Sequence, residues 1–333
     1  MIRPTLEDVA REAGVSRATV SRVVRKDPSV ADKTVDRVQE AVKALGYIPN
    51  AAARTLASGT HNTIAVVVPE PDERIFADPF FGLTISGIST RLKTTPFQLV
   101  MVFATSPGTS ATKDFLLAGG VAGAIVVSHH RTDGLAAAIS KLQLPSVFVG
   151  APLHREALTE PVHIVDADNF AGGQVAAQRL LARGVKHPAS IAGPLDMTAA
   201  VKRLQGWQEV VEAAGLSTVI AEGDFTMGSG RQVAGKLLDE HPEIDGIFVG
   251  SDLMAAGALD ELRARGIEPG REIQVVSFDD FDLAAQYDLT TVKNPAIELG
   301  AEAANMLVSL ISGPQPQSER VILPVTLTAR STG

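Results

Sequence analysis

The chain contains no cysteine among its 333 residues. This absence excludes disulfide bonds, thiolate zinc sites and a cysteine nucleophile, and it is compatible with a reducing compartment. The sequence also lacks any run of about 18 apolar residues, the length that a membrane-spanning helix needs, and its first residues lack the apolar segment of a signal peptide. We therefore expect a cytoplasmic protein with no membrane partner.

The common signatures of enzymes are missing as well. The sequence has no P-loop, no dinucleotide fingerprint after a predicted strand, no G-x-S-x-G motif and no histidine pair at metal-ligand spacing. The stretch GSGRQV fails the glycine spacing of a nucleotide loop, and the adjacent carboxylates of Asp279 and Asp280 are only a weak hint of acid–base chemistry. The sequence therefore predicts no catalytic residues, no metal and no cofactor.

Negative charge exceeds positive charge, but the balance changes along the chain. The formal net charge is −8, whereas residues 1–60 hold ten lysines and arginines against seven acidic residues, an excess of +3. The remaining 273 residues therefore carry −11. A basic N-terminal part on an acidic body concentrates the attraction for DNA phosphates in one part of the chain.

Three short amphipathic helices are predicted in the first 46 residues. Thr5 and Asp8 have the spacing of a capping box for a first helix, which ends at Gly14. Ser16 can cap a second helix that presents arginines near its N-terminus, and a third helix is expected over about 33–45. Two short helices joined by a glycine-containing turn are typical of the helix-turn-helix, whose second helix enters the DNA major groove.

Residues 5–59, from TLEDVAREAG to AAARTLASG, resemble the DNA-binding head of the LacI/GalR family of bacterial repressors along their whole length. The resemblance implies that Arg17, Ala18 and Arg22 read bases, and the forked donors of arginine suit O6 and N7 of guanine. It implies contacts with the DNA backbone, which fix register, for Thr5, Ser16, Thr19, Ser21, Thr34, Tyr47 and Asn50. The chain departs from the family at Ala31, where relatives often have a serine that caps the third helix.

Residues 47–60 are expected to form a hinge. Asn50 can cap a helix that is too short to persist alone in water, because helix nucleation is unfavourable. By resemblance, the hinge folds only when two copies pair on the operator, with Ala53 and Leu56 in the minor groove. An apolar side chain such as Leu56 can wedge between base steps and bend the duplex. A flexible linker with an incidental leucine is the alternative.

From about residue 63 the pattern changes to nine short continuous apolar runs separated by helical stretches. Such runs, without strict polar alternation, are typical of strands buried on both faces of parallel sheets. The predicted fold class is therefore α/β, with an all-α helix-turn-helix head followed by doubly wound parallel sheets. Stretches such as DADNFAGGQVAAQRLLARG resemble the same family and the periplasmic sugar-binding proteins, which implies a two-lobed, periplasmic-binding-protein-like body.

The expected boundaries follow from these patterns and from the resemblance. They are a helix-turn-helix DNA-binding domain at 1–46, a hinge at 47–60, and an effector-binding and dimerisation domain at 61–333. Within the last domain, the first lobe is expected at about 61–163 and 293–322, and the second at about 164–292 and 323–333.

The resemblance also implies an effector held in the cleft between the lobes. The implied contacts are Phe80 and Phe81 from the first lobe, and Arg203, Phe225, Asp252 and Asp279 from the second. Aromatic faces stack on the apolar side of a sugar ring, while carboxylates and a forked arginine bind its hydroxyls. The two phenylalanines could instead be core residues, and Asp252 could cap a helix beginning at Leu253. His129 and His130 follow the third predicted strand and could reach the cleft, although adjacent loop histidines are more often only solvated.

These observations predict a sequence-specific DNA-binding transcription regulator, by family default a repressor. It would bind a palindromic operator on double-stranded DNA as a homodimer, with an affinity modulated by a sugar or sugar-like small molecule. The chain ends at Gly333, soon after its last predicted strand, without the heptad tail of tetrameric relatives, which favours a dimer. The alternative is a free solute-binding protein of the periplasmic type, against which the intact head argues. The sequence does not decide whether the effector releases DNA or strengthens its binding.

Overall fold

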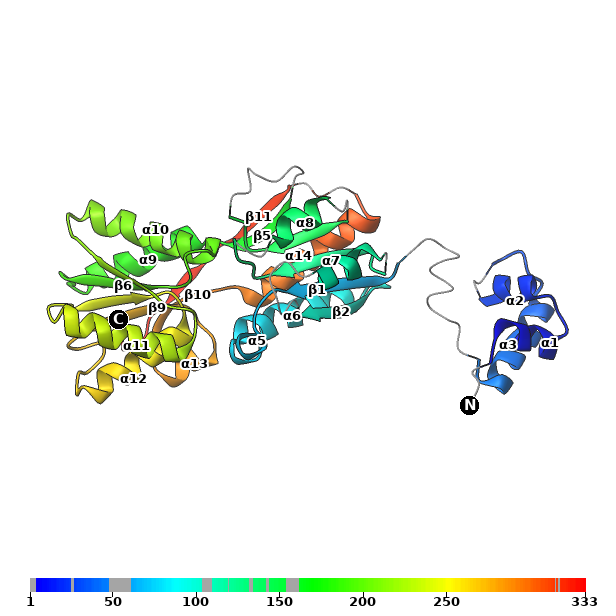
Figure 1. The fold of residues 1–333 in the computed structure, drawn as a ribbon, viewed down its shortest axis with the longest axis horizontal. Coiled ribbons are helices and arrows are strands. Elements are labelled where there is room, and N and C mark those ends of the chain that lie inside the picture. Colours follow the sequence, from blue (N-terminus) through cyan, green and yellow to red (C-terminus); the bar gives the residue numbers. More distant parts are fainter. Residues whose placement is uncertain are drawn as a thin grey trace. The chain divides into compact units, whose positions relative to one another are not determined.

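The computed structural model describes residues 4–24, 27–47, 61–103, 110–118, 120–131, 134–141, 144–153, 162–314, 316 and 318–333. The chain forms two compact units, which divide between His61 and Asn62 (Figure 1). We call the N-terminal unit the head and the C-terminal unit the body. No helix among the described residues is long and apolar enough to cross a membrane.

The described residues of the head form three helices, α1 (Leu6–Ala13), α2 (Arg17–Val24) and α3 (Asp32–Leu45). The predicted capping box is present at α1, where the Asp8 amide donates to the Thr5 hydroxyl (3.3 Å) and the Thr5 amide donates to the Asp8 carboxylate (2.9 Å). The Thr19 amide donates to Ser16 Oγ (3.1 Å), which caps α2. No side chain caps α3, because Ala31 at its start offers no acceptor. Local sequence signals therefore explain how α1 and α2 begin, whereas α3 begins without a side-chain cap.

A small core holds the three helices together. Its fully buried side chains are Val9, Val20 and Val38, one from each helix, and Tyr47 packs against them at the end of the head. The helical period then leaves the other faces of α2 in contact with solvent. This packing fixes which side chains of α2 are available to a partner.

The first lobe of the body is built on a six-stranded parallel sheet with the order β11-β5-β4-β3-β1-β2. Its strands are β1 (Thr63–Val68), β2 (Gln98–Phe103), β3 (Gly123–Val127), β4 (Ser146–Val149), β5 (His163–Ala167) and β11 (Arg320–Leu323). Its helices are α5 (Asp72–Ala77), α6 (Pro79–Leu92), α7 (Ser110–Leu117), α8 (Leu135–Lys141) and α14 (Ala296–Ser312). Helices α6 and α14 cover one face of the sheet, and α7 and α8 cover the other.

The second lobe repeats this architecture with the strand order β12-β10-β9-β8-β6-β7. Its strands are β6 (Pro188–Ala192), β7 (Val219–Glu222), β8 (Gly246–Val249), β9 (Gln274–Asp279), β10 (Thr290–Lys293) and β12 (Thr326–Thr328), and only β12 runs antiparallel to its neighbour. Its helices are α9 (Asn169–Ala182), α10 (Thr198–Ala213), α11 (Met227–Glu240), α12 (Asp252–Ala264) and α13 (Asp282–Gln286). The pairs α9–α10 and α11–α12 lie on opposite faces (Figure 1). The predicted α/β class with a helical head is confirmed.

The chain passes between the lobes three times, after β5, after β10 and after β11. The first crossing comes later than the expected position near Ile164. All of β5 stays in the first sheet, because it pairs with β4 on one side and with β11 on the other. The polar run Asp166-Ala167-Asp168 that follows its apolar residues therefore lies at the end of the strand, beside the crossing.

Candidate functional site

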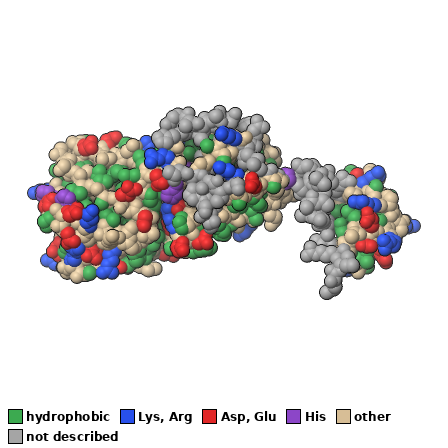
Figure 2. Space-filling view, in the orientation of Figure 1, with side chains coloured by type: hydrophobic (Ala, Val, Ile, Leu, Met, Phe, Trp, Pro, Cys, Tyr) green, Lys and Arg blue, Asp and Glu red, His purple; other side chains and the backbone are tan. Residues whose placement is uncertain are grey.

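The predicted base-reading side chains lie on the outer face of α2. Arg17, Ala18 and Arg22 are all exposed, and the head carries basic side chains on the face seen in Figure 2. Arg17 Nη1 lies 3.1 Å from Glu7 Oε1 of α1, in an ion pair that is open to solvent on both sides. The arginines are therefore placed for a partner that approaches α2.

The residues predicted to contact the DNA backbone differ in their exposure. Thr5 and Ser16 are exposed, Thr19, Ser21 and Thr34 are half-buried, and Tyr47 belongs to the core of the head. Ser16 and Thr19 also share a hydrogen bond of 2.9 Å between their hydroxyls. Asn50, Ala53 and Leu56 lie outside the described residues.

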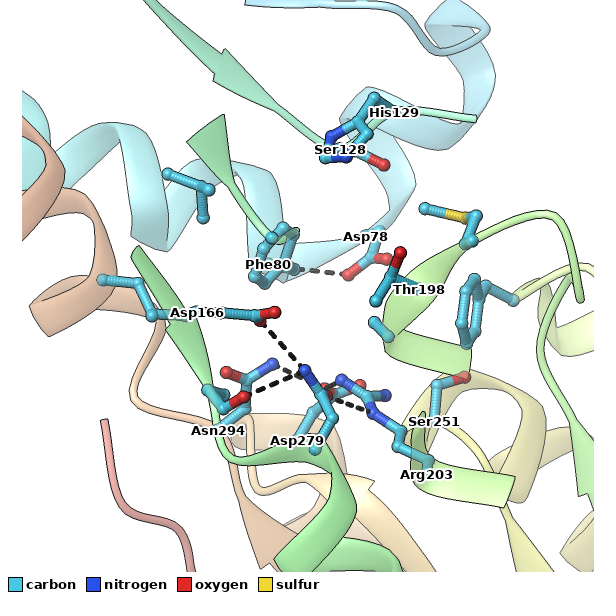
Figure 3. Close-up of a pocket in the computed structure, with 18 of the residues that line it drawn as sticks. Asp78, Phe80, Ser128, His129, Asp166, Thr198, Arg203, Ser251, Asp279 and Asn294 are labelled. Atoms are coloured by element: carbon cyan, nitrogen blue, oxygen red, sulfur yellow. Dashed lines mark hydrogen bonds and ion pairs between the residues drawn. The ribbon is translucent and has the colours of Figure 1, made fainter. Parts of the chain in front are cut away.

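A cavity of about 700 Å³, its open mouth included, lies in the body where strands of both sheets end. The first lobe contributes Asp78 and Phe80 at the start of α6 and Asp166 at the end of β5. The second contributes Arg203 of α10 and Asp279 at the end of β9 (Figure 3). The carboxyl ends of parallel strands at a chain crossing are the usual ligand site of doubly wound folds.

Arg203 is the central cation of the cavity. Its Nε donates to Asn169 Oδ1 (2.9 Å) and its Nη1 donates to the Gly250 carbonyl (2.6 Å). Its guanidinium also lies 3.6 Å from the ring centroid of Phe278 and 3.7 Å from Asp279 Oδ1. The backbones of α9 and α10 touch at this level, where a Cβ on Gly173 would lie 2.0 Å from the Arg203 carbonyl. Arg203 is thus held rigidly by its own lobe, on the cavity wall.

Three carboxylates surround this arginine, of which Asp166 and Asp279 are buried and Asp78 is half-buried. Asp279 accepts from Asn294 Nδ2 (3.1 Å), Asp166 accepts from the Ala151 amide (3.2 Å), and Asp78 accepts from the Phe80 amide (3.0 Å). Burial raises the pKa of Asp279 and of Asp78, and it raises the pKa of Asp166 to about 6. The nearby positive charge of Arg203 opposes all three shifts. These groups have free acceptor capacity toward the cavity, which suits a ligand that donates hydrogen bonds.

Aromatic rings complete the lining. Phe80 stands near the carboxylates, and Phe225 lies under Arg74, whose guanidinium is 5.0 Å from the ring centroid. Arg74 is in turn neutralised by Glu70, 2.7 Å away. The cavity therefore offers flat apolar faces and anionic acceptors together, which is the chemistry of sites that bind rings carrying hydroxyls.

Comparison with known proteins agrees with this architecture. Residues 5–50 match the model of the lacI family of bacterial regulatory proteins, and residues 177–332 match a periplasmic binding protein-like domain. The HTH-type transcriptional regulator CelR of Thermobifida fusca is 40% identical, over 99% of this chain and 98% of the relative. The chain belongs to the LacI family. It is therefore a transcription regulator and not an enzyme.

Solved LacI-family structures resemble the whole chain. A complex of a transcriptional regulator CelR with cellobiose has 37% sequence identity and a TM-score of 0.78, covering 99% of this chain and 100% of the other. The lac repressor dimer bound to its operator and the anti-inducer ONPF has 29% identity and a TM-score of 0.86, covering 99% of each chain. The ribose operon repressor of Halalkalibacterium halodurans is a further relative, 30% identical over 98% of this chain and 96% of its own length.

Four of the six cavity residues expected from the LacI-family resemblance line the cavity: Phe80, Arg203, Phe225 and Asp279. Phe81 does not, because its side chain is 1% exposed and packs in the core of the first lobe. Asp252 does not either. It accepts hydrogen bonds from the hydroxyls of Ser277 and Thr291 and from the Phe281 amide, and Ser251 caps α12 in its place. In this structure Phe81 and Asp252 therefore make contacts that support the fold, and neither lines the cavity.

The sequence reasoning missed several polar residues of the cavity. Asp78 precedes α6 as its N-cap, Asp166 ends β5, and Asn169 begins α9. A signal was available, since all three stand where a strand ends or a helix starts, the positions that face ligands in parallel sheets. His129, which the sequence left open, also lines the cavity.

Strained backbone is concentrated at this cavity. Three lining residues other than glycine have a positive φ: Ser128 (62°), Phe225 (66°) and Asp279 (129°). A Cβ on Gly193 would lie 2.1 Å from the Phe225 ring, so this ring packs directly on bare backbone. Such conformations cost free energy and cluster at functional sites. Their concentration here therefore supports the cavity as the candidate functional site of the body.

Proposed function

We propose that this protein binds a near-palindromic operator as a homodimer and that a sugar or sugar-like effector in the body changes its affinity for DNA. One observation carries the proposal: the cavity is lined from both lobes, so a single ligand there contacts both. A ligand with different affinities for two lobe arrangements shifts the equilibrium between them. Residues 1–46 would then be the DNA reader, 47–60 the hinge, and 61–333 the effector-binding and dimerisation domain.

The exposed face of α2 supports the DNA reader. Arg17 and Arg22 are the pair that can hydrogen-bond guanine edges in the major groove, and Ala18 offers only a methyl contact. A dimer brings two such helices to successive major grooves, which explains why a palindromic site is expected. Ser16, Thr19 and the other polar residues around α2 would fix the register on the phosphates.

The edge of the first sheet supports the homodimer. Phe76 of α5 is 77% exposed, and its ring lies 6.0 Å from that of Phe103 on the edge strand β2. Val100 on the same strand is also exposed. Neighbouring exposed apolar side chains on an edge strand are typical of a surface that another chain covers.

The charge of the cavity supports a neutral, hydroxyl-rich effector. Near pH 7 the charges of Asp78 and Asp166 outnumber that of Arg203, because the other lining arginine is already paired with Glu70. Burial raises the pKa of Asp279 to about 8, so this carboxyl is largely protonated and adds little negative charge. An anionic ligand would meet like charge, whereas sugar hydroxyls can donate to the carboxylates. Cellobiose, which the solved structure of one relative contains, is the first compound to test, followed by other neutral sugars and then sugar phosphates.

The hinge proposal concerns residues outside the described ones. Leu56 would wedge between base steps, Ala53 would lie beside it, and Asn50 would cap the hinge helix. Leu56→Ala should weaken operator binding and reduce DNA bending while the effector affinity stays nearly unchanged. Electrophoretic bending assays measure the first two quantities, and normal bending in this variant would refute the wedge.

Footprinting, calorimetry and fluorescence anisotropy together test the whole proposal. In footprinting of DNA from the protein's own promoter region, the full chain should protect a dyad-like sequence. A sugar identified by calorimetry should then change the affinity of the chain for that DNA fragment, measured by anisotropy. Deletion of residues 1–60 should abolish DNA binding and leave the sugar affinity intact. The absence of any protected sequence, with and without candidate sugars, would count against a regulator that acts at its own operon.

A further inference from the structure

A second set of contacts joins the two lobes beside the cavity. His130 follows β3 in the first lobe, and Asp196 lies between β6 and α10 in the second. His130 Nδ1 lies 2.9 Å from both carboxylate oxygens of Asp196, and Nε2 lies 3.2 Å from Glu70 Oε1. The Arg131 amide also donates to the Asp196 carbonyl (3.0 Å). We call Glu70, His130 and Asp196 the interlobe clasp.

Glu70 is fixed by its own lobe. Its buried side chain accepts hydrogen bonds from Arg74 Nη1 (2.7 Å) and from the Ser128 hydroxyl. Burial would raise the pKa of Glu70, but the hydrogen bond from His130, the charge of Arg74 and the bond from Ser128 outweigh it, so the pKa lies below its usual value. Glu70 is therefore an anion at neutral pH, and it presents a fixed acceptor to the His130 ring.

The interlobe clasp favours a doubly protonated histidine. A neutral imidazole has one N–H donor, and its other ring nitrogen is an acceptor. Both ring nitrogens of His130 face carboxylates, so a neutral ring would direct a lone pair at one of them. The hydrogen bond to Glu70 raises the pKa of His130, burial opposes this, and Asp196 adds to the rise. Among the described residues, the carboxylates in contact with the ring are those of Glu70, from the β1–α5 segment, and Asp196, from the second lobe. Arg74 binds Glu70, and His129 and Arg131 flank His130 in the sequence.

The position of the clasp separates it from ligand contact. None of its three residues lines the cavity that the described residues form, but their chain neighbours Ser128, His129, Met197 and Thr198 do. Arg74 extends the same contact region, since its Nη1 lies 3.7 Å from Met197 Sδ in the second lobe. A change in the clasp should therefore alter how the lobes meet without removing a group that touches the ligand.

We propose that the interlobe clasp stabilises the closed arrangement of the two lobes and that closure takes up a proton on His130. When the lobes separate, the His130 ring keeps its contact with the Glu70 carboxylate and loses its contact with the Asp196 carboxylate. The open form therefore binds the proton on His130 less tightly. The clasp is then complete below the pKa of His130 in the open form, and it weakens as the pH rises through the higher pKa of the closed form. By linkage, acid favours the closed form and base favours the open one.

This property belongs to the body alone and does not require DNA or an effector. It bears on the proposed function, because a clasp that holds the lobes together lowers the cost of closing around a ligand. The clasp would thus add to the pH dependence that the cavity carboxyls Asp166 and Asp279 give to the effector affinity. Its test can be made without either partner, so its failure leaves the proposed function standing.

Single-molecule fluorescence energy transfer across the cleft provides the test. The chain has no cysteine, so Lys93→Cys in the first lobe and Lys236→Cys in the second, both at exposed positions, can carry the dyes. The labelled full chain, mixed with excess unlabelled chain, is measured at about pH 6 and about pH 8.5, on either side of the ordinary pKa of histidine, which is about 6.5. The variants are Asp196→Asn and His130→Gln, with His241→Gln as the control, since His241 lies on the second lobe beside Glu243 and away from the clasp.

We expect the labelled chain with His130 and Asp196 intact, and the His241→Gln control, to show mostly closed molecules at the lower pH and more open molecules at the higher pH. Asp196→Asn and His130→Gln should lower the closed-to-open ratio at the lower pH by about tenfold, the scale of one charge-assisted hydrogen bond, and should remove most of the pH response. Circular dichroism checks that each variant is folded. If only one of Asp196→Asn and His130→Gln folds, that variant alone tests the proposal. Distributions that coincide with those of the parent, or a parent that ignores pH, would overturn the proposal.

Discussion

The head and the cavity place their functional side chains in different ways. In the head, Arg17 and Arg22 project from one short helix, and their outward direction follows from the helical period alone. In the cavity, Arg203 is buried and bound by groups from three other segments, at Asn169, Gly250 and Asp279. A surface site of the first kind can change without affecting the fold, whereas a buried site of the second kind is coupled to stability.

The largest effect is expected for Arg22→Ala in the head. An arginine bound to a guanine contributes about 1–3 kcal/mol, and a dimer has two heads, so operator affinity should fall by about 30- to 25,000-fold. The thermal unfolding midpoint should not change, because the side chain is exposed. Anisotropy titration of the operator fragment measures the first quantity, and circular dichroism the second.

Arg11→Ala is the matched control for this variant. It removes the same charge from an exposed position near the end of α1, where Arg11 lies 3.4 Å from Asp8. Its effect should be small and similar for operator and unrelated DNA, as expected for a general electrostatic contribution. Equal losses in the two variants would show that Arg22 acts only through its charge.

A stability effect without a site role is expected for Asp252→Ala in the second lobe. The Asp252 carboxylate accepts hydrogen bonds from the hydroxyls of Ser277 and Thr291 and from the Phe281 amide. Removing the carboxylate leaves these buried donors without an acceptor. The free energy of unfolding should fall by about 3 kcal/mol. Urea denaturation of the full chain measures it, and a loss below about 1 kcal/mol would mean that water replaces the carboxylate.

The opposite pattern is expected for Asp279→Asn, because this carboxylate faces the cavity. The amide cannot make every hydrogen bond that the buried carboxyl makes with a ligand hydroxyl, and a buried polar group left unpaired costs about 1–3 kcal/mol, so the affinity for the bound sugar should fall by about 5- to 150-fold. The unfolding free energy should change little, since an amide of the same shape replaces a carboxyl whose pKa burial raises to about 8 and which is largely uncharged near neutral pH. Calorimetry with cellobiose, or with the sugar that binds most tightly in the screen, tests this, and an unchanged affinity would remove Asp279 from the site.

These two aspartates also show where prediction from sequence reaches its limit. The helices of the head, their caps and the nine apolar strands were predictable, because each depends on neighbours a few residues away. Both aspartates were expected in the cavity. Asp279 lines it, whereas Asp252 does not and instead binds the backbone amide of Phe281, just after β9. The difference depends on the contacts of Asp252 with residues 25 and 39 positions further along, which no local pattern reveals.

A similar limit applies to Phe81 and to the interlobe clasp. Phe80 and Phe81 are adjacent on α6, and adjacent side chains of a helix point about 100° apart, so only one of them can face the cavity. The sequence shows the pair but not the rotation of the helix. His130 and Asp196 are separated by 66 positions and meet only because β3 and β6 end at the same cleft. Contacts of this kind depend on topology, which the strand pattern indicates only in outline.

The smallest effect is expected for the ion pair between the Glu7 carboxylate and the Arg17 guanidinium on the head. Both side chains are mostly exposed, so the pair contributes little to stability, but Arg17 must leave Glu7 before it can reach a base. Glu7→Gln should therefore raise operator affinity by about two- to fivefold relative to Glu12→Gln, a variant with the same charge change on the same helix. Anisotropy titrations at two salt concentrations measure both variants. An affinity for Glu7→Gln below that of Glu12→Gln would mean that Glu7 orients Arg17 toward its base instead of competing for it.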